Sequence, residues 1–327
     1  MANELDGKFW KGIILGIMVA VISGLHFMVP TEPHGLHQVH IVLRKLYFLP
    51  PVVAAAWFGL RGALGVTSAV SIFFTIHAFF DWPGNYMEQA NQLGELAGFY
   101  VVGSVSGYLF ERQKRLLLDI AHAHEETLIS LVSALDLREH NTRLHSQRVK
   151  EYTLLLAERY GVSDAEKKMI GIGALLHDIG KIAVPDHILL KPSGLSKEEW
   201  AVMRKHPGEG YKLLKEIDFL QRSAEIVYAH HERFDGTGYP RGLKGEEIPL
   251  GARLFMVADV FDALTSVRPY RTPLEYWEAA AEISEQSGEH FDPAVVETFQ
   301  QIDPAEWEQI GRRLALAETQ AGEPSVR

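Results

Sequence analysis

The chain has 327 residues and a formal net charge of −10. Acidic residues therefore outnumber the basic ones that nucleic-acid binding requires, and no DNA partner is expected. The absence of cysteine excludes disulfides, thiolate metal sites and cysteine nucleophiles. Any metal site must therefore use histidine, of which there are 15, together with carboxylates and water.

The long apolar runs lie before residue 111, and they predict a membrane region over residues 1–110. We expect about four spans, at residues 12–29, 47–60, 63–80 and 93–110. The second is broken by Pro50 and Pro51, and the fourth contains Glu95 near its start. An N-terminal four-helix transmembrane region is therefore predicted.

Basic residues flanking these spans predict the orientation. An even number of spans puts both ends on one side, and that side carries six basic residues against two on the other: Lys8, Lys11, Arg61, Arg112, Lys114 and Arg115 against Arg44 and Lys45. We expect a multi-pass protein of the bacterial inner membrane with both termini in the cytoplasm.

Several histidines fall at the outward side of this arrangement. His34, His37 and His40 lie in the first outward loop, and His26 and His77 lie inside spans. A sensor that binds a metal or a small ligand is one interpretation. A polar loop with scattered histidines is the other, and the sequence favours it.

A polar segment without proline or glycine follows the last span and predicts a linker helix over residues 111–128 that continues to Leu135. Apolar or neutral residues recur there at alternating steps of four and three, the seam of a coiled coil: Leu117, Ala121, His124, Leu128, Leu131 and Leu135. Such a seam favours a parallel homodimer. The alternative is that its second half packs into the core of the next domain.

Helical periodicity continues through residues 129–315, without an alternating run long enough for a sheet, so the fold class is all-α throughout. In helical bundles, metal sites are built from inward-facing side chains of neighbouring helices. An apolar helix is expected to deliver His177 and Asp178 side by side and to end at Gly180. A buried aspartate beside a histidine indicates cation binding, because coordination offsets the cost of desolvation.

A second segment, HHERFDGTGYP at residues 230–240, places two histidines at the end of a helix before a glycine-containing loop. Gly236 and Gly238 would let the backbone approach a ligand, although these glycines and Pro240 also suit a simple turn. His145, His206 and Asp259 lie in comparable helical contexts. Together the five histidines and two aspartates suit two divalent ions.

Residues 130–302 resemble the HD-GYP family, the branch of the HD phosphohydrolases associated with breakdown of cyclic di-GMP. The matching motifs stand in order along the chain: HDIGK at 177–181, KHP at 205–207, HHE with DGTGYP at 230–240, IPLGARL at 248–254, VADVFDALTSVRPYR at 257–271 and FDP at 291–293.

The resemblance implies roles for individual residues. The metal ligands would be His145, His177, Asp178, His206, His230, His231 and Asp259, with Asp178 bridging two ions. Lys181 would lie near the scissile phosphate and act with Asp178 in catalysis. The residues expected to face the substrate are Tyr239, Gly236, Gly238, Arg268 and Arg271.

Some members of the family place a glutamate four residues before the first histidine ligand, where it helps to hold a third metal. Asn141 stands at that position. The resemblance therefore implies two metal ions, with iron or manganese favoured and nickel, cobalt or zinc also accepted. Linear pGpG would be the main product rather than GMP.

The expected function is a membrane-anchored, metal-dependent phosphodiesterase that hydrolyses cyclic di-GMP. One alternative is a low-turnover cyclic di-GMP sensor, or a module that docks onto a diguanylate cyclase of the GGDEF class. Another is an HD hydrolase of a different cyclic nucleotide. Residues 316–327 are expected to form a disordered tail.

Overall fold

A computed structural model of the chain describes residues 2–29, 34–81, 86–139, 144–266 and 272–321. These residues form helices and no β-strand, in agreement with the all-α prediction. They divide into two compact units, Met1–His124 and Glu125–Arg327. The helix α4 (Tyr86–Glu139) has residues in both.

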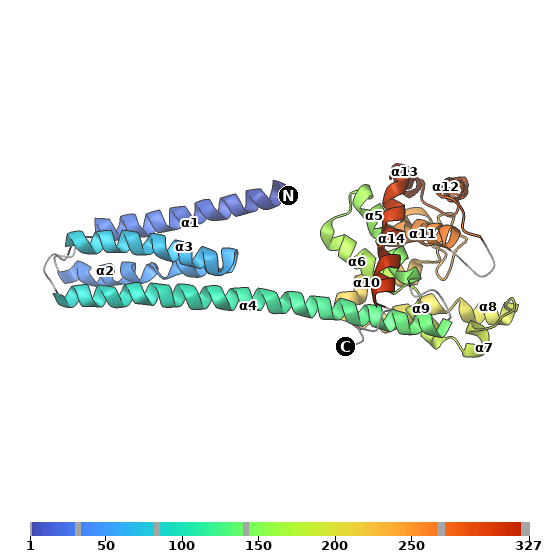
Figure 1. Cartoon of the computed structure of the whole chain (residues 1–327), viewed down its shortest axis with the longest axis horizontal. Helices are drawn as coiled ribbons and strands as arrows, with labels where there is room; N and C mark the ends of the chain where they lie inside the picture. Colours follow the sequence, from blue (N-terminus) through green and yellow to red (C-terminus); the bar gives the residue numbers. More distant parts are fainter. Residues whose placement is uncertain (1, 30–33, 82–85, 140–143, 267–271, 322–327) are drawn as a thin grey trace. The chain divides into compact units, whose positions relative to one another are not determined.

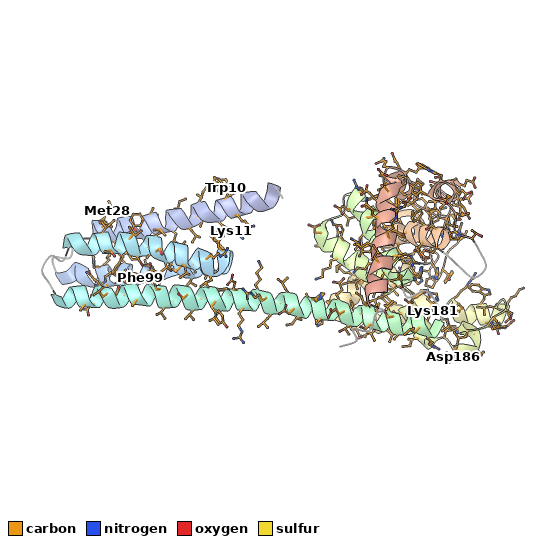
Figure 2. All side chains as sticks on the ribbon, in the orientation of Figure 1. Trp10, Lys11, Met28, Phe99, Lys181 and Asp186 are labelled. Atoms are coloured by element: carbon orange, nitrogen blue, oxygen red, sulfur yellow. The ribbon has the colours of Figure 1, made fainter. Side chains whose placement is uncertain are left out.

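The first unit contains α1 (Ala2–Met28), α2 (His34–Leu46), α3 (Leu49–Asp81) and the first part of α4. These helices lie alongside one another (Figure 1). Phe99 of α4 is fully buried among them, whereas Trp10 and Met28 of α1 project outward (Figure 2). Large apolar side chains exposed on the outside are what a lipid-facing surface requires.

Three helical stretches are long and apolar enough to cross a membrane: Gly7–Met28, Gln38–His77 and Ala90–Arg138. The middle one folds back on itself at Gly59, whose φ of 68° breaks the helical backbone of α3. Pro51 and Thr67, on either side of this break, both lie against Gly103 of α4. The number of membrane crossings, expected to be four, stays a prediction.

The predicted linker belongs to α4, which continues without interruption to Glu139. Its seam residues differ in environment. Leu117 and Leu131 are exposed, whereas Leu128 and Leu135 are partly or fully buried in the second unit, where Leu128 packs beside the buried Val132. The second half of the seam is thus partly used for packing within the chain.

The second unit is a bundle of short helices. Its elements are α5 (His145–Tyr160), α6 (Asp164–Leu175), η1 (Ile179–Ala183), α7 (Asp186–Leu189), α8 (Lys197–Met203), α9 (His206–Lys215), η2 (Asp218–Leu220), α10 (Gln221–Ala229), η3 (Gly245–Glu247), α11 (Leu250–Thr265), α12 (Tyr276–Glu285), α13 (Pro293–Gln300) and α14 (Pro304–Ala321).

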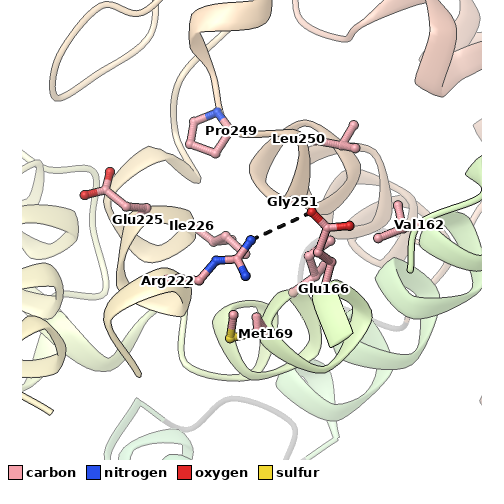
Figure 3. A pocket seen from close by; sticks show the side chains of 10 residues that line it. Val162, Glu166, Met169, Arg222, Glu225, Ile226, Pro249, Leu250 and Gly251 are labelled. Atoms are coloured by element: carbon pink, nitrogen blue, oxygen red, sulfur yellow. Dashed lines mark ion pairs between the residues drawn. The ribbon is translucent and has the colours of Figure 1, made fainter. Parts of the chain in front are cut away.

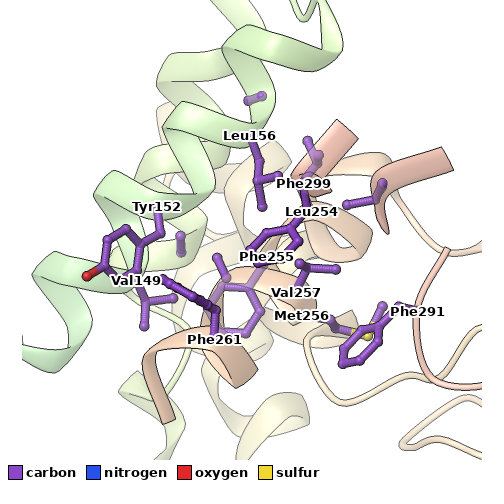
Figure 4. Close-up of a cluster of buried hydrophobic side chains, with 14 of the residues drawn as sticks. Val149, Tyr152, Leu156, Leu254, Phe255, Met256, Val257, Phe261, Phe291 and Phe299 are labelled. Carbon is purple, nitrogen blue, oxygen red and sulfur yellow. The ribbon is translucent and has the colours of Figure 1, made fainter. Parts of the chain in front are cut away.

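The apolar helix α11 lies at the centre of this unit and packs against α5, α6, α10, α12 and α13. Phe255 and Phe261 of α11 meet Tyr152 and Leu156 of α5 and Phe299 of α13 in one buried cluster (Figure 4). Because α11 is enclosed on several sides, its polar residues are held in a rigid frame. The last helix, α14, extends to Ala321, so residues 316–321 are helical where a disordered tail was expected.

Candidate metal centre

The seven residues expected to bind metal come from five separate parts of the second unit. His145 begins α5, His206 begins α9, and His230 and His231 directly follow α10. His177 and Asp178 lie between α6 and η1, and Asp259 lies in α11. The structure brings all seven together as two adjacent sets: Asp178 with His206, His230 and His231, and His145 with His177 and Asp259.

Asp178 links these two sets through its two carboxylate oxygens. Oδ2 lies 3.1 Å from Nε2 of His177, which belongs to the set of His145, His177 and Asp259. Oδ1 lies 3.3 Å from Nε2 of His206 and 3.9 Å from Nε2 of His230, in the other. A carboxylate in this position can offer one oxygen to each of two ions.

Four of the five histidines donate a hydrogen bond from Nδ1 to a fixed acceptor. The acceptors are the carbonyl oxygens of Ala174, Met203 and Val227, at 2.9, 2.8 and 2.6 Å from His177, His206 and His230, and the carboxylate of Asp262, at 2.8 Å from His145. Each bond fixes the tautomer and leaves Nε2 as the coordinating nitrogen, an arrangement typical of metal-binding histidines. The donor set therefore fits divalent transition metals.

Asp262 is a functional residue that the motifs did not reveal. It is almost fully buried and also accepts hydrogen bonds from Arg148, at 2.6 Å from Nε and 3.0 Å from Nη2. Burial alone would raise its pKa, but the hydrogen bonds from His145 and Arg148 outweigh burial and lower the pKa below its usual value. The available signal was its position three residues after Asp259 on one apolar helix.

The backbone around the HD pair differs from the prediction. The helix α6 ends at Leu175, before His177, and the chain continues as the 3₁₀-helix η1 through Gly180. This turn presses against the start of α9, where a Cβ on Gly180 would lie 1.9 Å from the carbonyl oxygen of His206. The tight contact requires glycine and brings Asp178 within reach of His206.

Burial and neighbouring charges shift the pKa values of the clustered histidines in opposite directions. Burial lowers the pKa of His177, but the neighbouring charge of Asp178 more than reverses this and raises it to about 9. Burial and the nearby His206 lower the pKa of His231 to about 3, and burial with His231 lowers that of His230 well below its usual value. The last two histidines are therefore neutral and ready to coordinate.

Lys181 lies at the same centre. It belongs to η1, and its Nζ is 2.8 Å from Oδ2 of Asp178. Its side chain is mostly buried, so its charge acts in a partly desolvated environment.

The loop after α10 is held by Glu232, which is fully buried. Its carboxylate accepts hydrogen bonds from the backbone N–H groups of Arg241 and Leu243, at 2.8 and 3.0 Å. Gly236 has a φ of 87°, and a Cβ on Gly238 would lie 2.3 Å from the backbone nitrogen of Arg233. Both glycines are therefore required by the fold of the loop itself.

Tyr239 of this loop contacts the clustered residues through His231. Its ring stacks on that of His231 with centroids 4.8 Å apart, and the guanidinium of Arg204 lies 5.1 Å from its centre. Burial raises the pKa of Tyr239 to about 12. The tyrosine thus contacts His231 of the centre directly, and its role in binding substrate stays a prediction.

Three residues singled out in the sequence, Asn141, Arg268 and Arg271, lie outside the described residues. A cavity of about 300 Å³ elsewhere in the unit lies between α6, α10 and the start of α11 (Figure 3). It is flanked by the Arg222–Glu166 ion pair, at 3.8 Å, and none of the seven clustered residues lines it.

Comparison with known proteins identifies the family to which the chain belongs. The HD domain family matches residues 123–295, which is more than half of the chain and includes all seven clustered residues. The chain is 42% identical over 224 residues to the cyclic di-GMP phosphodiesterase response regulator RpfG of Xanthomonas campestris, covering 67% of this chain and 59% of that protein.

Two further relatives are similar over the same region. A cyclic di-GMP phosphodiesterase of Thermotoga maritima is 40% identical, covering 61% of this chain and 57% of its own length. The 3′3′-cGAMP-specific phosphodiesterase 2 of Vibrio cholerae is 40% identical, covering 56% of this chain and 35% of its own length. The chain thus spans between a third and three fifths of these relatives. From the family match, the chain belongs to the HD domain family.

Proposed function

We propose that the chain is a membrane-anchored, metal-dependent phosphodiesterase that hydrolyses cyclic di-GMP. The observation that carries the proposal is the position of Asp178, with one carboxylate oxygen toward His177 and the other toward His206 and His230. Relatives named as cyclic di-GMP phosphodiesterases support the choice of substrate.

The seven clustered residues would hold two divalent ions, with iron or manganese favoured and nickel, cobalt or zinc accepted. Five imidazoles bind such ions without cancelling their charge, and Asp178 and Asp259 supply the two carboxylates. Bound ions would supply Lewis acidity, activating water and neutralising charge on the phosphodiester. The Nδ1 hydrogen bonds keep the ligand side chains oriented for this task.

Lys181 is the residue that acts on the reacting phosphate in this proposal. Its ammonium group is held beside the centre by Asp178 and can donate to a phosphoryl oxygen or to the departing 3′-oxygen. Tyr239, on the edge of the centre, would contact a guanine base, and Gly236 and Gly238 would shape the adjacent loop. Arg268 and Arg271 would hold the second phosphate.

The predicted two-ion centre leads to linear pGpG as the main product. Asn141 carries this part of the proposal, because its amide is a poorer ligand than a carboxylate for a third ion.

The membrane region would anchor the enzyme in the bacterial inner membrane as a multi-pass segment with both termini in the cytoplasm. The three apolar stretches support anchoring. A parallel homodimer through the first part of the linker is supported by exposed apolar side chains there: Leu116, Leu117, Leu118 and Ile120. A GGDEF-class diguanylate cyclase remains a proposed partner.

A second candidate substrate is 3′3′-cGAMP, because relatives specific for it match this chain nearly as well as those named for cyclic di-GMP. A low-turnover sensor of cyclic di-GMP is a further candidate, which the complete ligand set disfavours.

The full chain in lipid nanodiscs, loaded anaerobically with Fe(II) or Mn(II), would be given cyclic di-GMP and 3′3′-cGAMP in separate reactions. The proposal predicts a higher kcat/KM for cyclic di-GMP and accumulation of pGpG. Preference for 3′3′-cGAMP would select the second candidate. Tight binding of cyclic di-GMP without turnover would select the sensor.

A further inference from the structure

Three buried histidines of the first unit form a cluster unrelated to the HD centre. His26, His40 and His77 come from α1, α2 and α3 and are 1%, 1% and 3% exposed. Each offers one ring nitrogen, and these three nitrogens lie within 4.8 Å of one another. A convergence of three imidazoles from three helices is unusual for a purely apolar core.

The spacing fits a tetrahedral metal ion. Nε2 of His26 lies 3.1 Å from Nε2 of His40. Two imidazole nitrogens on one tetrahedral zinc ion, each about 2.0–2.1 Å from it, would be about 3.3 Å apart. The same distance of 3.1 Å separates Nε2 of His206 from Nε2 of His230 in the HD centre of this chain.

The surroundings hold the rings in place. The rings of His26 and His77 are stacked with centroids 3.9 Å apart, so one of them would turn in order for both to bind the same ion, and Tyr47 and Phe74 lie around His26 at 5.4 and 6.3 Å. Nε2 of His77 donates a hydrogen bond to the carbonyl oxygen of His26, at 3.2 Å. Among the described residues, Nδ1 of His26 is buried without a hydrogen-bond partner. The nitrogen that faces His40 is Nε2, so an ion between these rings would bind there and not at this Nδ1.

The donor set selects the kind of ion. Within the part of the chain that the structure describes, the cluster offers three imidazoles and no carboxylate, which does not suit magnesium or calcium, since these ions require oxygen ligands. Imidazole suits zinc, copper and nickel, and a site with three histidines leaves the fourth position of zinc open to water or an anion. Glu95 of α4, an acidic residue of the same unit, already pairs with Arg44 at 3.2 Å and Lys45 at 2.8 Å.

We propose that His26, His40 and His77 form a binding site for a late first-row transition-metal ion, such as Zn²⁺, in the membrane unit. All three lie at the same end of the apolar stretches, two of which end at Met28 and His77. On the predicted orientation this is the outward end, so the ion would enter from outside the cytoplasm. The ion would tie α1, α2 and α3 together.

Occupancy would also affect α4. Phe74 lies between the cluster and Phe99 of α4, with ring centroids 6.3 Å from His26 and 5.3 Å from Phe99 (Figure 2 labels Phe99). A change in the packing of α3 at the ion would therefore alter the packing of α4 around Phe99.

The test counts zinc in the full chain in nanodiscs by elemental analysis, after stripping and reloading at micromolar free Zn²⁺. The background carries His177→Ala and His230→Ala, which remove a ligand from each set of the HD centre. The proposal predicts one ion per chain in this background. His26→Gln, His40→Gln or His77→Gln should each abolish it, while His122→Gln, at an exposed histidine of the same unit, should leave it.

Zinc bound equally in the His26→Gln, His40→Gln and His77→Gln chains, or no zinc in the background chain, would overturn the proposal and leave three hydrogen-bonded core histidines. If a substituted chain misfolds, as judged by helix content, X-ray absorption on the zinc-loaded background chain decides. Coordination by three imidazole nitrogens is expected, and fewer would contradict the site. This result is independent of whether cyclic di-GMP is hydrolysed.

Discussion

Nδ1 of His145 donates a 2.8 Å hydrogen bond to the buried carboxylate of Asp262. The same carboxylate accepts hydrogen bonds from Nε and Nη2 of Arg148, at 2.6 and 3.0 Å. Asp262 does not belong to either set of clustered ligands. Asp262 orients the imidazole of His145, so that Nε2 of His145 is directed toward Oδ1 of Asp259, 3.5 Å away. The arrangement matches the carboxylate–histidine pairs that support metal ions.

Replacing Asp262 by Asn should weaken metal binding by about 10- to 100-fold, because the amide can present N–H toward His145 and loses the charge that aligns it. Metal affinity of the full chain, measured by competition with a chelating dye, checks this. Asp218→Asn, at an exposed aspartate of the same unit, is the matched control. Equal affinities in the two variants would show that Asp262 is only structural.

Lys181→Ala should lower kcat by about 10²- to 10³-fold, the usual effect of removing one donor that stabilises charge in the transition state. Metal content should remain unchanged, since Lys181 is not a clustered ligand. Steady-state kinetics with elemental analysis separates the two effects. Lys212→Ala, at an exposed lysine of α9, is the control. A large rise in KM with kcat preserved would instead make Lys181 a binding residue.

Metal uptake should depend on pH through His177, whose pKa is raised to about 9. Below that pKa the metal-free imidazole is protonated, so an ion must displace a proton in order to bind. Apparent affinity should therefore rise as pH increases from 7 and level off above about 9, with protons released on binding. Calorimetry in buffers of different ionisation enthalpy measures this release, and a pH-independent affinity would contradict the protonated state.

Glu232→Gln should destabilise the loop after α10 by about 1–3 kcal/mol, because one backbone N–H group would face an amide N–H instead of a carboxylate oxygen. Chemical denaturation and kcat/KM would both report the change. Glu225→Gln, at a more exposed glutamate of α10 that pairs with Arg241, should have a much smaller effect. Comparable losses in both variants would argue against a special role for Glu232.

The sequence was informative about the site because its ligands occur within short motifs. All seven residues expected to bind metal converge, although they come from five separate parts of the second unit. The all-α class followed from helical periodicity. Asp262 and Glu232 were not assigned roles, since their function depends on which side chains the fold brings near them, and spacing along the chain does not reveal that.

The local backbone was harder to predict. Periodicity continued the α6 helix through His177 to Gly180, whereas the helix stops at Leu175. The cause is tertiary: the tight approach of Gly180 to the start of α9 is incompatible with a side chain and is not encoded in local propensity. The fold-back at Gly59, by contrast, lies close to the break expected between the spans at residues 47–60 and 63–80.

Hydrolysis of cyclic di-GMP by the metal-loaded full chain, beside its Asp178→Asn variant, tests the central claim most directly. Asparagine keeps the shape of the side chain but can no longer offer an anionic oxygen to each set of histidines. The account predicts turnover that falls by at least about 10³-fold in the variant, equivalent to several kcal/mol of transition-state stabilisation. Equal turnover in the two chains would contradict it.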